Sequence, residues 1–225
     1  MRLLLHAVAT TDAAAVPQTG LRGQPLAIVQ HAELAAYASC LDAASEPFRR
    51  ADLLEHHDLI SALASQTEGL LPARFPTWFA DRDALRRELE RRQDDLVAGL
   101  ARVRGRVELA VTAVWTTAEL EVGVPPEALT PGRKYLLERQ REFGASERRR
   151  ARARELADDL ERRLANDLVE VRHEICPSST VAVSSAVLVA RIHAEKIKAQ
   201  LIRAEQDVRI LVNGPWPAYT FVNVV

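Results

Sequence analysis

Histidine and cysteine are the residues of this 225-residue chain best suited to bind a metal, so their spacing comes first. His56 and His57 are adjacent, which places them about 100° apart on a helix, not on one metal-binding face. His173 and Cys176 are three residues apart, and no second ligand pair of matching spacing accompanies them. We therefore predict no metal site. The plainer interpretation of the histidine pair is one partly packed side chain beside one solvated side chain.

Serines, carboxylates and glycines do not form a catalytic or phosphate-binding pattern either. No Gly-x-Ser-x-Gly elbow surrounds any of the serines considered, which are Ser61, Ser65, Ser178, Ser179, Ser184 and Ser185. The acidic pairs at 94–95 and 158–159 fall on polar helix faces, where a solvated surface explains them. The glycines are scattered singly, so neither glycine-rich phosphate motif occurs. The sequence predicts no catalytic residue, no cofactor and no small-molecule substrate.

The strongest local charge is the run "ERRRARARE" at 147–155. Clustered arginines attract polyanions, so residues 148–154 are a candidate nucleic-acid contact. Acidic residues at 147, 155, 158, 159 and 161 offset this charge, and aromatic residues for base stacking are missing. A solvated helix face is the favoured interpretation, with a protein-docking role second.

The stretch "NGPWPAYTFV" at 213–222 concentrates rigid residues in a chain that is only 5% aromatic. Gly214 permits backbone conformations that other residues avoid. Pro215 and Pro217 push their predecessors toward extended geometry, which holds Trp216 in a stiff bracket. We predict that the residues after it alternate as a strand. Two interpretations remain open: the aromatic residues seal the core of the second domain, or they anchor a partner protein.

Hydrophobic periodicity predicts the elements that carry these residues. Strands are expected at 3–9, 25–31, 34–41, 70–75 (an edge strand), 106–115, 181–190 and 208–214. Helices are expected at 51–67, at 81–103, from beyond Gly144 to about His173, and at 192–206. This mixed order favours an α+β fold with domains 1–104 and 105–225, the second containing the long helix.

The overall composition limits the classes of protein to consider. Thirty basic and 31 acidic residues give a net charge of −1, which provides no argument for nucleic acid or a membrane surface as a partner. Two distant cysteines suggest free thiols in a reducing compartment. No run approaches the roughly 18 apolar residues of a spanning helix. We expect a cytoplasmic protein with no membrane partner.

Three segments resemble the gas vesicle GvpF/GvpL family: residues 53–79, 131–143 and 213–222. Their order and spacing match as well, so the resemblance covers nearly the whole chain, and the Gly-Pro-Trp-Pro segment is its most specific part. Ala218 and Thr220 stand where the family commonly has proline and serine. Pro76 and Trp78 replace a glycine and a small apolar residue that usually follow the Arg-Phe pair.

The resemblance implies an N-terminal ferredoxin-like α/β sandwich, joined to a C-terminal α+β domain that ends in the Gly-Pro-Trp-Pro segment. It also implies a non-enzymatic accessory or minor structural protein of the gas vesicle, which contacts the small apolar shell protein and other accessory proteins. The residues that we assign to partner contact or structural anchoring are Trp216, Tyr219, Phe221, Arg74, Phe75 and Trp78.

Two alternatives come from other classes of protein. A small-molecule enzyme on a ferredoxin-like fold would need a polar pocket with converging titratable groups. A nucleic-acid-associated protein would use the 148–154 arginine run and lose salt-dependent DNA binding when Arg148 to Arg150 are neutralised. Within the gas vesicle interpretation, we predict that Trp216→Ala harms folding more than partner choice.

Overall fold

The computed structural model describes residues 2–11, 17–42, 47–116, 131–176, 178, 180–204 and 207–222. The chain divides into two compact units. The N-terminal unit consists of Met1–Glu108, Ala190–Ile192 and Pro215–Val225, and the second unit of Leu109–Val189 and His193–Gly214. The division into domains 1–104 and 105–225 stays a prediction. The terminal segment after Gly214, however, groups with the N-terminal unit.

The N-terminal unit contains a four-stranded sheet with the order β2-β3-β1-β4. Its strands are β1 (Arg2–Thr10), β2 (Leu26–His31), β3 (Leu34–Leu41) and β4 (Leu70–Phe79), and β4 lies at an edge as predicted. All paired strands are antiparallel. This strand order and these directions are ferredoxin-like, which confirms the expected fold. The short 3-10 helix η1 (Leu21–Gly23) replaces a helix between β1 and β2.

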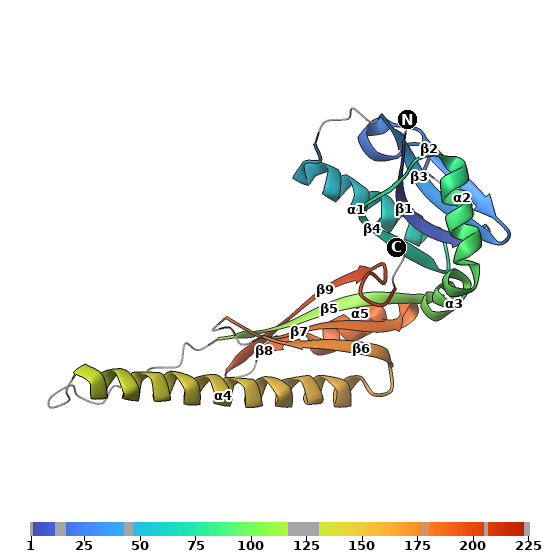
Figure 1. Ribbon diagram of the computed structural model, residues 1–225. Helices are drawn as coiled ribbons and strands as arrows, with labels where there is room; N and C mark the ends of the chain where they lie inside the picture. Colours follow the sequence, from blue (N-terminus) through green and yellow to red (C-terminus); the bar gives the residue numbers. More distant parts are fainter. Residues whose placement is uncertain are drawn as a thin grey trace. The chain divides into compact units, whose positions relative to one another are not determined.

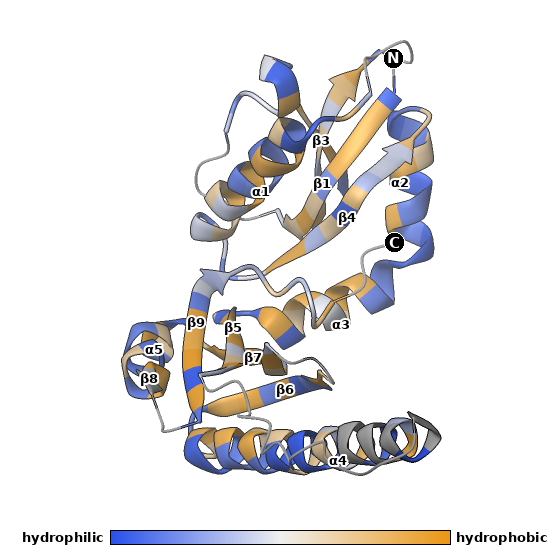
Figure 2. Cartoon of the chain, turned by 90° about the vertical axis from the view of Figure 1, so that its left-hand side faces the viewer, coloured by the Kyte–Doolittle hydropathy of each residue, from blue (hydrophilic) through white to orange (hydrophobic). Residues whose placement is uncertain are grey.

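Helices cover both faces of this sheet (Figure 2). Helix α1 (Arg50–Ser65) packs Leu59, Ile60 and Leu63 against alanines of β1 and β3. Helices α2 (Arg82–Arg91) and α3 (Gln93–Val103) lie on the other face. The sequence predicts one helix over 81–103; the structure interrupts it at Arg92. The apolar stripe continues across that interruption, so periodicity alone could not reveal it.

A β-bulge in β1 decides which side chains reach α1. The register of β1 shifts between Leu5 and Ala7. Both His6, which bonds to His56 of α1, and Ala7, which belongs to the α1-facing core, therefore lie on the same side of the sheet. The bulge thus places Ala7 on the same face as His6, whose ring meets the Ser39 hydroxyl there.

The second unit contains a five-stranded sheet with the order β6-β7-β5-β9-β8 (Figure 1). Its strands are β5 (Arg106–Trp115), β6 (Leu168–Ile175), β7 (Val181–Ala190), β8 (Arg203–Ala204) and β9 (Val208–Trp216). The long helix α4 (Pro131–Leu164) packs on this sheet through Ala153, Leu156 and Ala157. The short elements η2 (Arg191–His193) and α5 (Ala194–Leu201) follow β7. This is the α+β arrangement with a long helix that we expected.

The limits of α4 differ from those predicted. The helix begins at Pro131, runs through Gly144 and ends at Leu164, whereas residues 168–175 form β6. Asn166 and Asp167 lie in the intervening turn, and the Asp167 amide donates to the Leu164 carbonyl over 2.8 Å. The apolar residues of 168–175 fit both a helical and an alternating pattern, so the turn residues were the decisive signal.

Among the helices in the described part of the chain, none combines the length and the apolar character that crossing a membrane requires.

Candidate functional site

The six residues assigned to partner contact or anchoring all belong to the N-terminal unit. They form two groups, and each group contacts α1. Trp216 and Tyr219 lie beside His57, with Phe221 buried in the same segment. Phe75 lies beside His56, with Trp78 farther along β4. Arg74 is exposed on β4 next to Phe75.

The terminal segment leaves β9 at Trp216 and then turns. Gly214 has φ of 109°, in the region that favours glycine, directly before the Pro-Trp-Pro bracket. The Tyr219 amide donates to the Pro217 carbonyl over 2.7 Å, and the Phe221 amide to the Ala218 carbonyl over 3.3 Å. The expected strand over 219–222 is therefore wrong. The missed signal was that Pro217 offers no N–H to a ladder, which favours a turn.

His57 joins this segment to α1. Its Nδ1 lies 3.1 Å from the Tyr219 hydroxyl, and its ring is 5.9 Å from that of Tyr219 and 6.3 Å from that of Trp216. Burial, helped by the nearby Glu108 carboxylate, raises the pKa of Tyr219, so the phenol stays protonated and neutral. His56 is buried and His57 is partly buried, whereas the sequence predicted that one of the pair would be solvated.

Glu108 fixes the end of the segment. Its carboxylate is buried, and it accepts hydrogen bonds from the Thr220 amide over 2.8 Å and the Thr220 hydroxyl over 2.7 Å. Phe221, only 2% exposed, follows immediately. Two hydrogen bonds to a carboxylate and one buried aromatic ring give the segment a defined position on the N-terminal unit. The interpretation that Trp216 and Phe221 seal the core of domain 105–225 stays a prediction.

Trp216 borders a cavity of about 180 Å³ in the N-terminal unit. Its walls are mainly apolar: Ala64, Leu70, Val103, Val107, Pro215, Trp216, Pro217 and Ala218. Arg106, Arg191 and Glu68 supply charge at the same cavity. Trp216 is 37% exposed there, so an indole in a rigid bracket faces both the cavity and solvent. Such an arrangement is suited to an apolar side chain of a binding partner.

The second group is an aromatic cluster on the β4 edge. Phe48 lies 4.6 Å from Phe75 and stacks at 5.6 Å on Trp78, measured between ring centroids. Trp78 is 36% exposed, and the Arg22 guanidinium lies 5.3 Å from the Phe48 ring centre. The cluster therefore presents an indole stacked on the Phe48 ring, which in turn packs against Phe75.

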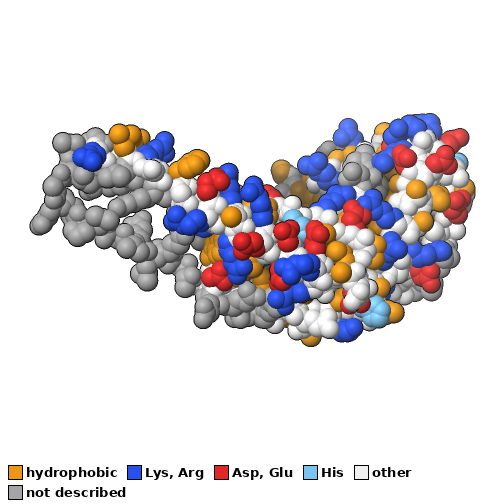
Figure 3. Space-filling model, turned by 90° about the horizontal axis from the view of Figure 1, so that it is seen from below, with side chains coloured by type: hydrophobic (Ala, Val, Ile, Leu, Met, Phe, Trp, Pro, Cys, Tyr) orange, Lys and Arg blue, Asp and Glu red, His pale blue; other side chains and the backbone are white. Residues whose placement is uncertain are grey.

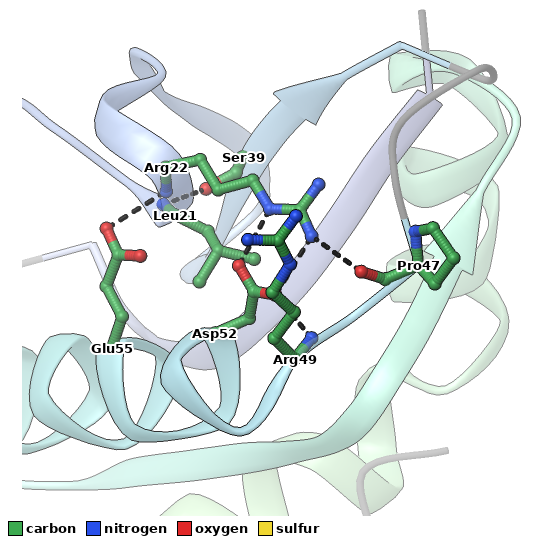
Figure 4. A network of polar contacts seen from close by, with 7 residues as sticks. All are labelled: Leu21, Arg22, Ser39, Pro47, Arg49, Asp52 and Glu55. Carbon is green, nitrogen blue, oxygen red and sulfur yellow. Dashed lines mark hydrogen bonds and ion pairs between the residues drawn. The ribbon is translucent and has the colours of Figure 1, made fainter.

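The ion pair between Arg22 and Asp52, drawn in Figure 4, lies next to this cluster, because Arg22 also contacts the Phe48 ring. Arg22 donates from Nε to Asp52 over 2.7 Å, and the Arg49 amide donates to the same carboxylate over 2.6 Å. These bonds lower the pKa of Asp52 to about 2. The backbone amide of Arg22 also donates to Glu55 over 2.9 Å. Together they attach η1 to α1 and hold the residues that precede the helix.

A buried polar chain, missed by the sequence analysis, lies under α1. Nδ1 of His6 is 2.8 Å from Nδ1 of His56, and its Nε2 is 2.7 Å from the Ser39 hydroxyl. Burial lowers the pKa of His6 to about 3 and that of His56 to about 4, so both rings are neutral near pH 7. A histidine inside the apolar run of β1 was the available signal. In the described part of the chain, no three potential ligands gather at a metal-binding distance.

Ser185, His173 and Glu161 form a second polar chain, with the residue types of a hydrolytic triad. His173 lies 2.7 Å from the Ser185 hydroxyl and 3.1 Å from the Glu161 carboxylate. However, Ser185 is 4% exposed, and the neighbouring cavity has a volume of only about 30 Å³. That space suits a single water, not a substrate. Since His173 and Ser185 are also direct cross-strand partners, the chain ties β6, β7 and α4 together.

The arginine run is tied to acidic neighbours. Arg150 pairs with Glu147 at 3.5 Å, and Arg152 pairs with Asp207 at 2.9 Å. The latter pair raises the pKa of Arg152 and lowers that of Asp207. Part of the charge of 148–154 therefore serves contacts within the second unit.

Comparison with known proteins gives one consistent result. The family described as gas vesicle synthesis protein GvpL/GvpF matches residues 3–223. Gas vesicle protein L2 of Halobacterium salinarum is 30% identical over 194 residues, which cover 75% of this chain and 70% of that protein. Gas vesicle protein L1 of the same organism is 28% identical over 195 residues, covering 75% and 69%.

Solved structures share the fold. The crystal structure of GvpF from Anabaena sp. PCC7120 superposes with a TM-score of 0.76 at 17% identity, covering 100% of this chain and 99% of that one. GvpF from Microcystis aeruginosa gives a TM-score of 0.70 at 16% identity, covering 98% of both chains. With a family match along almost its full length, this chain belongs to the gas vesicle synthesis protein GvpL/GvpF family.

Proposed function

We propose that this protein is a non-enzymatic accessory and minor structural protein required for gas vesicle assembly. In this proposal it acts in the cytoplasm at the gas vesicle and binds the small apolar shell protein together with other accessory proteins. The observation that carries the proposal is the family match over residues 3–223. Its physical basis is that a subunit with a water-repelling face aggregates when exposed, so that a soluble escort favours assembly.

Two surfaces of the N-terminal unit support a binding role. β4 is an edge strand of the sheet and carries Trp78, and an edge strand can accept an added strand from a partner. The terminal segment offers Trp216 beside an apolar cavity of about 180 Å³. Because these indoles are held by Phe48 and by the Pro-Trp-Pro bracket, little conformational entropy is lost on binding. We assign shell-protein contact to these two surfaces.

The proposal is tested in a vesicle-forming host whose own copy of this gene is deleted. The chain is supplied as wild type, Trp216→Ala, Trp78→Ala or Leu211→Ala, and the shell protein is co-purified with it. Leu211 is a matched control, since it is 37% exposed, as Trp216 is, but belongs to the second unit. We expect both tryptophan variants to retain several-fold less shell protein, and the control to match wild type.

Electron microscopy of the same cells separates the two parts of the proposal. Normal vesicles in the deletion strain would contradict a role in assembly. If the deletion strain lacks normal vesicles but both tryptophan variants capture as much shell protein as wild type, only the assignment of the two surfaces is contradicted.

A further inference from the structure

Only part of α4 is used to cover the sheet of its own unit. Its 34 residues span about 51 Å at 1.5 Å per residue. The longest strands of that sheet, β5 and β7, have 10 residues each and span about 33 Å. Among the α4 residues whose burial the structure describes, the first buried one is Ala153. The N-terminal part of the helix therefore projects past the strands, as Figure 1 shows.

The projecting part carries large apolar side chains on a defined face. Tyr135, Leu136 and Phe143 are 59%, 68% and 71% exposed. At 100° per residue, all three point within about 60° of the direction of Ala157, which packs against the sheet. The stripe that forms the core at one end of α4 thus continues into solvent at the other. We call Tyr135, Leu136 and Phe143 the projecting face.

Exposed arginines flank the projecting face. Arg133 and Arg139 lie about 60° to either side of Leu136 on the helix. Arg150 and Glu147 also lie on this side of the helix, where they pair with each other at 3.5 Å and offset each other's charge. Figure 3 shows hydrophobic and basic side chains next to one another toward this end of α4. Apolar side chains and arginines therefore lie next to one another on one face of the helix.

We propose that the projecting face is a docking surface for an acidic amphipathic helix of another protein. Leucine-type side chains of that helix pack between Leu136 and Phe143, and its carboxylates face Arg133 and Arg139. A helix laid along an apolar stripe with complementary flanking charge is a common mode of peptide recognition. A second copy of this chain is disfavoured, because two such segments would bring like charges together. This surface is additional to the two assigned to the shell protein.

The test uses the purified full chain and synthetic peptides in fluorescence anisotropy. The probe is a labelled amphipathic helix with leucine at the a and d heptad positions and glutamate on the flanks. Its counterpart carries lysine in place of every glutamate. The variants are Leu136→Ser/Phe143→Ser and, as a control, Ile192→Ser, an 86% exposed apolar residue of the other unit. All three side chains are exposed, so the unfolding temperatures of the variants are expected to match that of wild type, which circular dichroism checks.

We expect the acidic peptide to bind wild type and the control equally, and the double variant at least about tenfold more weakly. Added salt should weaken binding, and the lysine peptide should not bind. Equal binding of the double variant, or equal binding of both peptides, would overturn the proposal. Displacement of the peptide by a duplex DNA whose own binding is unchanged by the double substitution would also overturn it. Self-association of wild type that the double variant abolishes would do the same. Because purified protein is used, failure here leaves the role in vesicle assembly untouched.

Discussion

The Tyr219 hydroxyl lies 3.1 Å from Nδ1 of His57, although the two residues are 162 positions apart in the sequence. This contact joins the terminal segment to α1, and Thr220 and Phe221 extend the attachment to Glu108 and the core. The segment with the most specific family signature is therefore part of the N-terminal unit. Its aromatic residues divide into a buried anchor, Phe221, and a partly exposed indole, Trp216.

That division predicts different consequences for two aromatic deletions. Phe221→Ala should lower the free energy of unfolding by about 3–5 kcal/mol, the usual range for removing a buried phenyl ring. Trp216→Ala should cost about 1 kcal/mol, because its side chain is already 37% exposed. Urea denaturation of both variants measures this. The exposure of Trp216 leads us to expect a loss of binding larger than the loss of stability, the reverse of the ranking made from the sequence. A larger destabilisation by Trp216→Ala would support the sequence ranking.

The Glu108–Thr220 contact predicts a specific loss of attachment. Thr220→Val keeps the shape of the side chain and removes the hydroxyl that donates to Glu108 over 2.7 Å. A hydrogen bond to a charged group contributes about 1.5–3 kcal/mol, so unfolding should become easier by that amount. Hydrogen exchange should also quicken at the amides of 219–221. Thr77→Val is the control: Thr77 is partly buried and its hydroxyl donates to an uncharged acceptor, the Arg74 carbonyl, so the loss should be smaller.

The buried histidine pair predicts a loss of stability in mild acid. The folded-state pKa values of His6 and His56, about 3 and 4, lie below the unfolded value of 6.5. The unfolded chain therefore binds more protons below pH 6.5, and stability falls as the pH drops from there toward 4. By pH 5 each histidine should have cost about 2 kcal/mol relative to pH 8.

Urea unfolding between pH 5 and 8 checks this slope, and His6→Asn should flatten it. The carboxylate of Asp52 does not interfere, because its lowered pKa affects stability only as the pH falls through about 4 toward 2. An unchanged slope in His6→Asn would show that other groups cause the acid sensitivity.

Gly20 predicts a steric requirement next to the same polar chain. A Cβ at this position would stand 2.1 Å from the Ser39 hydroxyl oxygen, which accepts from the Leu21 amide and contacts His6. Gly20→Ala should therefore destabilise the protein by several kcal/mol, on the order of the cost of overpacking a core. Adding Ser39→Ala should recover part of this loss, so the two effects should not be additive.

The matched control is Gly144→Ala in α4, where the nearest side-chain atom to an added Cβ is 3.5 Å away. Alanine favours a helix interior over glycine by about 1 kcal/mol, so this variant should be as stable as wild type or more stable. Thermal unfolding compares Gly20→Ala, the double variant with Ser39→Ala, and Gly144→Ala. Additive losses in the double variant would contradict the clash with Ser39.

The helices and strands were predictable wherever one periodicity dominated. The runs at 3–9, 106–115 and 181–190 became β1, β5 and β7 because apolar β-rich stretches bury well in a sheet. The prediction failed at 168–175, where a helical and an alternating period fitted equally well. It also failed at Arg92, where the apolar stripe continues across the interruption between α2 and α3. The strand predicted for 219–222 failed because Pro217 cannot donate to a ladder.

The sequence by itself determined the family, the α+β class and the aromatic residues that were candidates for contact, since these depend on local patterns and motif spacing. Only the tertiary structure decided that Tyr219 meets His57, that Thr220 meets Glu108, and that His6 meets His56 and Ser39. It also decided which tryptophans remain partly exposed. Each of these relationships joins residues distant in the chain. They arise from sheet register, the β1 bulge and the path of the terminal segment, which no local pattern specifies.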